Sequence, residues 1–150
     1  LLDKTDTYHG NSITEFSAKI ASKYLNKVNY IFANPPYGLD DYGFDFASEC
    51  KKEGKELERW KYGVPNATDG EYAFLQSIVA LITNASDRAI AGVVASLGTL
   101  FNSTTLNQRK ILIEQNDWVE GIIVLPGKLF NTTDIPVCFW IINKNKSEKK

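Results

Sequence analysis

The four residues Asn34-Pro35-Pro36-Tyr37 suit one chemical task, which is to activate an amino group on an aromatic ring. Such a nitrogen is a poor nucleophile because its lone pair is delocalised into the ring. Two hydrogen-bond acceptors on its N–H bonds would draw the nitrogen towards tetrahedral geometry and localise that lone pair. The Asn34 side-chain carbonyl and the Pro35 backbone carbonyl can supply them. Because the prolines restrict the backbone at and before them, these acceptors would be in place before a substrate arrives.

Tyr37 would add an aromatic face on which a flipped base could stack, a contact worth about 1–3 kcal/mol per base. No general base is needed, because a methylated ammonium is acidic and loses its proton readily. The competing interpretation is a proline turn that only ends a strand, since turns are common there. The hydrophobic run over 28–33 directly before the motif favours the chemical interpretation.

The elements that must position this motif alternate between strands and helices. Short apolar runs predict strands over 28–33, 89–95, 119–125 and 135–143, and apolar residues at helical spacing predict helices over 71–83 and 104–115. Residues 39–70 form an excursion with weaker patterning and a short helix expected over 49–59. This order is typical of an α/β fold with a mostly parallel sheet. Ligands bind beyond the carboxyl ends of such strands, which directs attention to residues 34–37, 96–100 and 126–130.

Composition limits the partners that the chain can bind by itself. The 150 residues are 43% hydrophobic and carry a formal net charge of −1, which suits one domain with a buried core. The chain lacks the basic footprint of a self-sufficient DNA-binding domain, so other segments or another subunit would have to grip DNA. No apolar run is long enough to span a bilayer, so we expect no membrane partner. Cys50 and Cys138 form no CxxC pair, and His9 is the single histidine. We therefore expect free thiols, a cytoplasmic protein and no metal site.

Several stretches resemble segments of known families, in the same order along the chain. Asn34-Pro35-Pro36-Tyr37 resembles the Asn-Pro-Pro-Tyr/Phe motif of amino-group methyltransferases. The others resemble the modification subunit of type I restriction systems, and they are Gly10-Asn11-Ser12-Ile13 (G-N/D-S/T-L/I), Arg59-Trp60-Lys61-Tyr62-Gly63-Val64-Pro65 (R-F/W-x-Y/F-G-x-P), Glu71-Tyr72-Ala73-Phe74 (D-x-A-F), Gly98-Thr99-Leu100-Phe101 (G-x-L-F) and Leu125-Pro126-Gly127-Lys128-Leu129-Phe130 followed by Ile135-Pro136 (LP-x-x-L-F, then IP). Each stretch is short, but their collinear order is specific. Glu71 departs from the aspartate of the family.

The resemblance implies a Rossmann-like class I S-adenosylmethionine-dependent methyltransferase fold with a final antiparallel strand. The implied reaction transfers a methyl group from S-adenosylmethionine to N6 of an adenine flipped out of DNA. Asn34, Pro35, Pro36 and Tyr37 would form the catalytic motif, and Phe130 would face the other side of the adenine. The implied partners are DNA, a specificity subunit that reads the target sequence and a restriction subunit in the full complex.

The resemblance also implies that Asn11 and Phe74 contact the cofactor, and each candidate has a structural alternative. Asn11 could cap a turn or a helix that begins near residue 14. Phe74 could belong to the helix core, because it fits the apolar periodicity. Phe130 could plug the end of the sheet, as buried aromatic residues often do. Trp60 and Tyr62 lie in the excursion, where a DNA-facing loop is expected, and they are candidate DNA contacts.

The glycine-rich cofactor loop that opens this domain in the family has no counterpart before Gly10. We therefore interpret residues 1–146 as a partial catalytic domain and residues 147–150 as a charged tail or linker. The chain alone is expected to be inactive and to bind S-adenosylmethionine weakly or not at all. Saturable binding in the micromolar range, measured by calorimetry, would contradict this expectation.

Two other functions remain open. The same motif serves enzymes that methylate the N5 amide of a protein glutamine, because an amide nitrogen presents the same lone-pair problem. The chain could also be a non-catalytic fragment that docks a specificity subunit, which its near-neutral charge and missing cofactor loop would suit. The segments 59–65, 98–101 and 125–130 favour the DNA-modifying family over the protein-modifying one.

Overall fold

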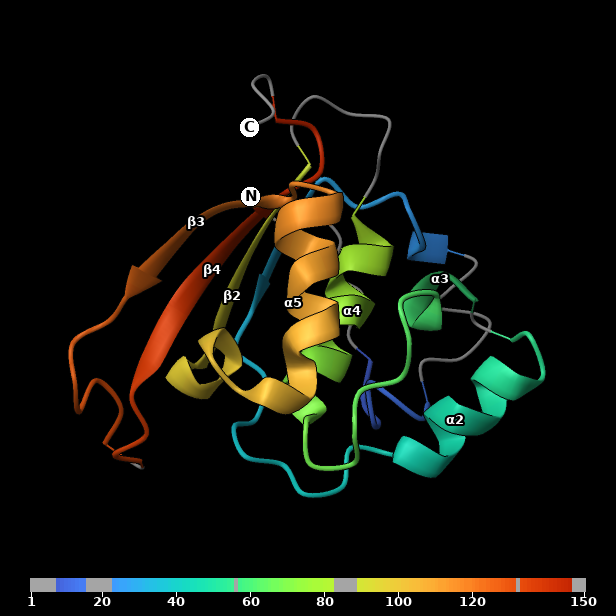
Figure 1. The fold of residues 1–150 in the computed structure, drawn as a ribbon, viewed down its shortest axis with the longest axis horizontal. Coiled ribbons are helices and arrows are strands. Elements are labelled where there is room, and N and C mark those ends of the chain that lie inside the picture. Colours follow the sequence, from blue (N-terminus) through green and yellow to red (C-terminus); the bar gives the residue numbers. More distant parts are fainter. Residues whose placement is uncertain (1–7, 16–22, 56, 83–88, 132, 147–150) are drawn as a thin grey trace.

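The fold is built around a four-stranded sheet. The computed structural model describes residues 8–15, 23–55, 57–82, 89–131 and 133–146. The strands lie in the order β1 (Tyr30–Ala33), β2 (Ile90–Ser96), β4 (Val137–Asn143) and β3 (Val119–Val124). β1 pairs in parallel with β2, and β4 pairs antiparallel with both β2 and β3. The predicted mostly parallel sheet with a final antiparallel strand is therefore confirmed (Figure 1). The tail predicted over 147–150 lies outside the described residues.

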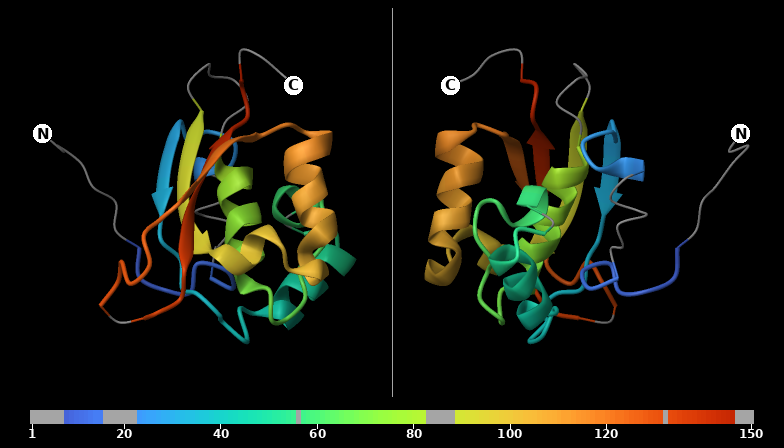
Figure 2. Two further views of the ribbon diagram at one scale, coloured as in Figure 1. Left: turned by 60° about the vertical axis from the view of Figure 1, so that its left-hand side comes forward. Right: turned by 90° about the vertical axis from the view of Figure 1, so that its right-hand side faces the viewer.

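Helices cover one face of this sheet (Figure 2). They are α2 (Phe44–Lys52), α3 (Leu57–Trp60), α4 (Gly70–Leu81) and α5 (Leu106–Lys110), and α5 continues as a π-helical segment over Ile111–Gln115. Helix α4 packs directly on β2, and α3 packs on α4. The single helix predicted over 49–59 is wrong, because two shorter helices form in this region. Gly54 follows α2 with a φ of +69°, a left-handed conformation that ends a helix.

The main core lies between the sheet and the helices. Six side chains of the two central strands that point to this face are fully buried, and they are Ala91, Val93, Ala95, Cys138, Trp140 and Ile142. Side chains alternate between the two faces of a strand. On the opposite face Tyr30 is 53% exposed and Phe32 is 78% exposed. Within the described ranges, the helices therefore cover one face of the sheet only.

A second apolar cluster joins the 39–70 excursion to the outer side of α4. Its buried members are Ile13, Tyr42, Ala47, Cys50, Trp60 and Ala73. The Tyr42 hydroxyl donates a hydrogen bond to the Pro65 carbonyl at 2.7 Å, which ties the two ends of the excursion together. The excursion is thus a packed unit around α2 and α3. Its sequence pattern is weak because its core is assembled from residues that are far apart in the chain.

Glu71 fastens the first turn of α4 to the end of β2. Its carboxylate accepts hydrogen bonds from the backbone N–H and from the hydroxyl of Ser96, each at 2.6 Å. Hydrogen bonds to a charged group are stronger than those between neutral groups. The N-terminal end of α4 and the carboxyl end of β2 are therefore held together at the edge of the sheet that is formed by the carboxyl ends of β1, β2 and β3.

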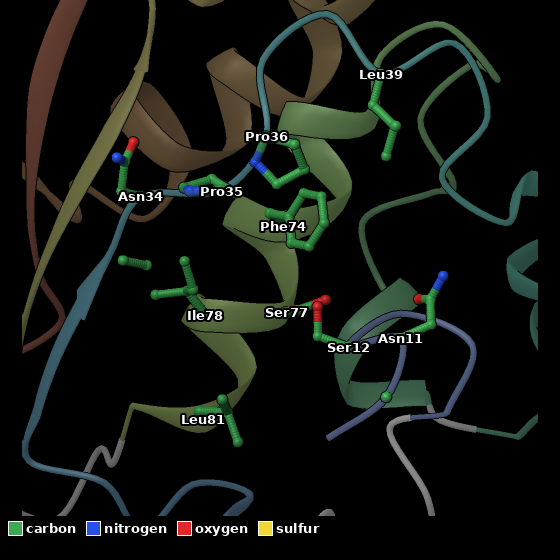
Figure 3. A pocket seen from close by; sticks show the side chains of 12 residues that line it. Asn11, Ser12, Asn34, Pro35, Pro36, Leu39, Phe74, Ser77, Ile78 and Leu81 are labelled. Carbon is green, nitrogen blue, oxygen red and sulfur yellow. The ribbon is translucent and has the colours of Figure 1, made fainter. Parts of the chain in front are cut away.

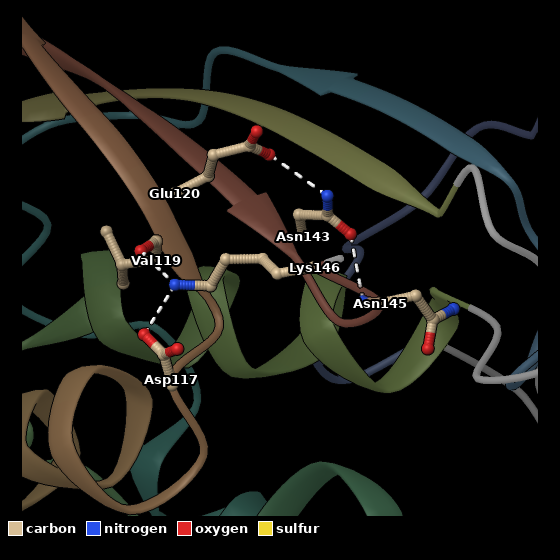
Figure 4. Close-up of polar contacts among 6 residues, drawn as sticks. All are labelled: Asp117, Val119, Glu120, Asn143, Asn145 and Lys146. Carbon is tan, nitrogen blue, oxygen red and sulfur yellow. Dashed lines mark hydrogen bonds and ion pairs between the residues drawn. The ribbon is translucent and has the colours of Figure 1, made fainter. Parts of the chain in front are cut away.

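The opposite edge of the sheet, where β1, β2 and β3 begin, is closed by side chains at the end of β4 and just beyond it. Lys146 donates to the Asp117 carboxylate and to the Val119 carbonyl, and Asn143 donates to Glu120 (Figure 4). These contacts join the start of β3 to the end of β4. They lie far from the strand ends that carry the candidate catalytic motif.

We expect Glu71→Ala to lower the free energy of unfolding by about 1.5–3 kcal/mol, because the Ser96 N–H loses a charged acceptor. Ser96→Ala should lower it by less, since this change keeps the backbone hydrogen bond and removes only the hydroxyl. Urea unfolding followed by circular dichroism measures both effects. Equal losses in the two variants would contradict the arrangement of two separate bonds.

A second expectation concerns Lys144, whose ammonium donates to the Ile82 carbonyl at 3.0 Å. Burial, together with the charge of Lys61, lowers the pKa of Lys144 from 10.5 to about 8. Between these values the unfolded chain binds more protons than the folded one, so the free energy of unfolding should rise as the pH increases from about 8 to 10. Lys144→Met should remove this rise. Urea unfolding across that pH range would count against the assignment if both proteins gave the same slope.

Candidate active site

The predicted motif lies where the carboxyl ends of β1, β2 and β3 meet at one edge of the sheet. Asn34 directly follows the last residue of β1, and Pro35 is buried between the exposed residues Asn34 and Pro36. Ser96 ends β2 at the same edge, and residues 125–130 follow β3 there. Parallel strands place their carboxyl ends together. Three segments that are distant in the sequence therefore converge around Asn34.

The rings of Tyr37 and Phe130 contact each other at this edge. Their centroids are 6.1 Å apart and their planes are inclined at 39°, which lies within the range of attractive aromatic pairs. The two residues that were predicted to stack on a base are thus brought together. Phe130 is only partly buried and belongs to neither core cluster, which argues against its alternative role as a plug. A base could stack between these rings only after at least one of them moves.

The Tyr37 hydroxyl donates a hydrogen bond to the Asn34 side-chain oxygen. Burial raises the pKa of this hydroxyl, and the negative charge of Glu71 raises it further. The hydroxyl therefore stays protonated near neutral pH and remains a donor. An incoming amine would have to replace it at the Asn34 oxygen.

A cavity of about 470 Å³ lies beside the motif, and its size is within the usual range for small-molecule sites. Three segments line it: residues 10–12, residues 33–36 together with Leu39, and one face of α4 (Figure 3). The cavity brings Asn11 and Phe74, the two predicted cofactor contacts, to the same space as Asn34. These residues come from three separate parts of the chain.

The structural alternatives for Asn11 and Phe74 both hold, and both residues also line the cavity. The Asn11 side-chain oxygen accepts hydrogen bonds from the backbone N–H groups of Ile13 at 2.8 Å and Thr14 at 3.0 Å, so Asn11 does cap a turn. Phe74 is partly buried against the second apolar cluster and also lines the cavity. Neither residue is reserved for packing alone.

Sequence reasoning missed the rest of the α4 wall. Ser77, Ile78 and Leu81 line the cavity with Phe74. Their spacing of three, four and seven residues from Phe74 places all of them on one side of a helix. The periodicity was therefore a usable signal. It could not indicate that this side of the helix opens on a cavity.

Of the two predicted DNA contacts in the excursion, Trp60 does not fit the structure. Trp60 is 0% exposed and belongs to the second apolar cluster, so its prediction is corrected: a fully buried ring has no surface to offer to a duplex. The Tyr62 ring packs edge-on against Trp118, with 5.8 Å between centroids. Trp118 directly precedes β3, so Tyr62 lies at the edge of the sheet opposite to Asn34. The structure does not bring Tyr62 to the motif.

In the described part of the chain, no group of three or more histidine, cysteine, aspartate or glutamate side chains is placed to hold a metal ion. None of the helices in those residues is long and apolar enough to cross a membrane.

Known proteins resemble this chain over most of its length. The model of the family described as N-6 DNA Methylase matches residues 2–150. The type I restriction enzyme HindI methylase subunit of Haemophilus influenzae is 31% identical over 126 residues, which cover 82% of this chain and 26% of that protein. The type I restriction enzyme MjaVII methylase subunit of Methanocaldococcus jannaschii is 29% identical over 149 residues, which cover 95% of this chain and 25% of that protein.

A solved structure shares the fold. It is the methyltransferase subunit of a type I restriction-modification system from Streptococcus thermophilus, with a TM-score of 0.62 and 21% identity, covering 81% of this chain and 24% of that one. The chain thus spans about a quarter of the length of the curated relatives described above. Since the family match extends over nearly every residue, the conclusion is direct: the chain belongs to the N-6 DNA methylase family.

Proposed function

We propose that this chain is part of an enzyme that transfers a methyl group from S-adenosylmethionine to N6 of an adenine in DNA. The observation that carries the proposal is the position of residues 34–37 after β1, where Tyr37 contacts the Phe130 ring and residues 34–36 line the 470 Å³ cavity. The names of the relatives support a role as the methylase subunit of a type I restriction system. On the same ground, the proposed partners are DNA, a specificity subunit and a restriction subunit.

The cavity suits the adenosine portion of S-adenosylmethionine in size and lining. Its volume of about 470 Å³ can accommodate a nucleoside. Phe74 offers an aromatic face, and Asn11, whose oxygen is bonded to its own turn, presents a side-chain amide nitrogen that can donate to a ring nitrogen. When bound, the cofactor supplies a methyl group on a cationic sulfur. The role of these residues is to hold it beside Asn34.

The motif prepares the methyl acceptor. The Asn34 side-chain oxygen and the Pro35 carbonyl accept hydrogen bonds from the two N–H groups of the amine, which localises the lone pair on nitrogen. The Tyr37 hydroxyl, which donates to Asn34 in this structure, gives way to the amine. The Tyr37 ring then stacks on the base, with Phe130 on the other side. The methylated nitrogen is acidic and releases its extra proton to solvent.

A protein glutamine amide is the second candidate acceptor, because the same two carbonyls could activate it. The relatives that match 82% and 95% of this chain are methylase subunits of type I restriction enzymes, which favours DNA. The third possibility is a docking fragment with no catalytic role. The experiment below separates the three.

We expect the intact parent complex, supplied with labelled S-adenosylmethionine and unmethylated DNA, to place label in N6-methyladenine. Asn34→Ala should lower the rate by a factor of about 10²–10³, comparable to the loss of one preorganised hydrogen-bonding group elsewhere. Digestion of the DNA to nucleosides and scintillation counting give the measurement.

Label in adenine that survives Asn34→Ala would keep the reaction but refute this account of amine activation. Label in protein and not in DNA would move the assignment to glutamine. The absence of label from both would leave the docking function.

Substitutions of Tyr37 should separate the ring from the hydroxyl. Tyr37→Phe keeps the stacking face and frees the Asn34 acceptor, so the rate should stay within about threefold of the wild type. Tyr37→Ala should lower kcat/KM about 5- to 150-fold, which corresponds to the loss of about 1–3 kcal/mol of stacking. Steady-state kinetics on the target duplex measures both. Equal losses in the two variants would show that the hydroxyl, and not the ring, is needed.

A further inference from the structure

Arg59 is buried to 1% exposure in the excursion, and its guanidinium is directed at a distant segment of backbone. Both terminal nitrogens donate to the Ile13 carbonyl, each at 3.1 Å, across 46 positions of sequence. The guanidinium also lies over the ring of Trp60, 4.8 Å from its centroid. Hydrogen bonds from a charged donor are stronger than those between neutral groups. Arg59 therefore anchors the segment that contains Ile13 to α3.

Two more contacts fasten the same segment to the excursion. The Ile13 side chain is 1% exposed and packs in the second apolar cluster with Trp60. Gly43, in a left-handed conformation with φ of +97°, lies so close to Thr14 that an added Cβ would approach the Thr14 methyl group to 2.4 Å. The loop is thus fixed at Ile13 and Thr14 by α3 on one side and by the start of α2 on the other.

The residues just before this anchor form one wall of the cavity. Gly10, Asn11 and Ser12 line it together with Phe74 and Ser77 of α4, and Figure 3 shows Asn11 and Ser12 on a segment separate from α4. Asn11 is itself held by its hydrogen bonds to the N–H groups at positions 13 and 14. The Asn11 side chain therefore has a defined position only while Ile13 has one. Residues 10–12, which line the cavity, and Ile13, which Arg59 binds, are therefore neighbours in one short loop.

We propose that Arg59 is a positioning residue for the cofactor pocket, and that the excursion around α2 and α3 acts as the clamp that holds the pocket wall. This inference rests on the proposed function, because it assigns the cavity to S-adenosylmethionine. Arg59 touches neither cofactor nor substrate in this role. It acts through Ile13 and Asn11.

Arg59→Lys is an informative substitution because lysine keeps the positive charge but lacks the two terminal N–H donors of the guanidinium and its planar face over Trp60. In the full-length methylase subunit, Arg59→Lys should weaken binding of S-adenosylhomocysteine about tenfold, measured by calorimetry. The KM for S-adenosylmethionine should rise to a similar extent, while kcat at saturating cofactor stays within about twofold. Hydrogen exchange should accelerate at the amides of residues 13 and 14 and remain unchanged in α4.

Lys146→Met is the matched control for general loss of stability. It also removes an ammonium that binds a backbone carbonyl, that of Val119, but at the far edge of the sheet. It should lower the melting temperature without changing the Kd for S-adenosylhomocysteine. A Kd that changes equally in Arg59→Lys and Lys146→Met would overturn the positioning role.

A pair of glycine variants tests the clamp from the side of α2 and keeps the proposal open to refutation if Arg59→Lys fails to fold. Gly43→Ala strains the backbone and pushes on Thr14, whereas Gly54→Ala strains a backbone with φ of +69° and meets nothing within 4 Å. Only Gly43→Ala should weaken cofactor binding. Equal binding by both variants would overturn the clamp.

The wild-type protein separates this inference from the proposed function. If the full-length subunit does not bind S-adenosylhomocysteine, the assigned cofactor falls and the role of Arg59 falls with it. If the wild type binds it and the Arg59 and Gly43 variants bind it equally well, the methyltransferase assignment stands and only the positioning role is refuted.

Discussion

The pairing of β4 with both β2 and β3 is the constraint on which the candidate site depends. The register sets Ser96 opposite Val137 and Val124 opposite Cys138, so β2 and β3 end at the same level. β1 joins through its parallel pairing with β2, which brings the motif to this edge. A slip of one residue in either ladder would turn the buried side of β4 outward. It would also move the Phe130 loop relative to Tyr37.

Helix α4 connects this sheet to the cavity because different sides of it serve different neighbours. Tyr72 and Leu75 pack in the main core, Ala73 packs in the second cluster, and Phe74 lines the cavity. A helix that is apolar on nearly all sides must be buried on nearly all sides. The excursion supplies the cover that the sheet cannot. The same packing brings residues 10–14 to the cavity, so the second cluster shapes the site as much as the first.

In this chain the charged side chains stabilise the fold more than they take part in the proposed reaction. Arg59 binds the Ile13 carbonyl, Glu71 binds the Ser96 N–H, and Lys146 binds the Val119 carbonyl. Each joins a helix or a strand end to backbone that is remote in the sequence. The proposed reaction needs neutral hydrogen-bond acceptors at the amine and no titrating acid or base. The motif at 34–37 carries no charged side chain, and the charged side chains named above join other segments of the fold.

The chemistry of residues 34–37, and the order of strands and helices around them, could be predicted from the sequence because both depend on neighbouring residues. Proline restricts the backbone locally, and apolar periodicity reflects one element at a time. The environment of Trp60, Tyr62 and Arg59 could not be predicted in this way. Their burial depends on partners such as Ile13 and Trp118, 46 and 56 positions away in the chain. Only the folded chain determines which aromatic ring is buried, which carbonyl receives the guanidinium and which helix face opens on a cavity, because each of these is a contact between segments that the sequence keeps apart.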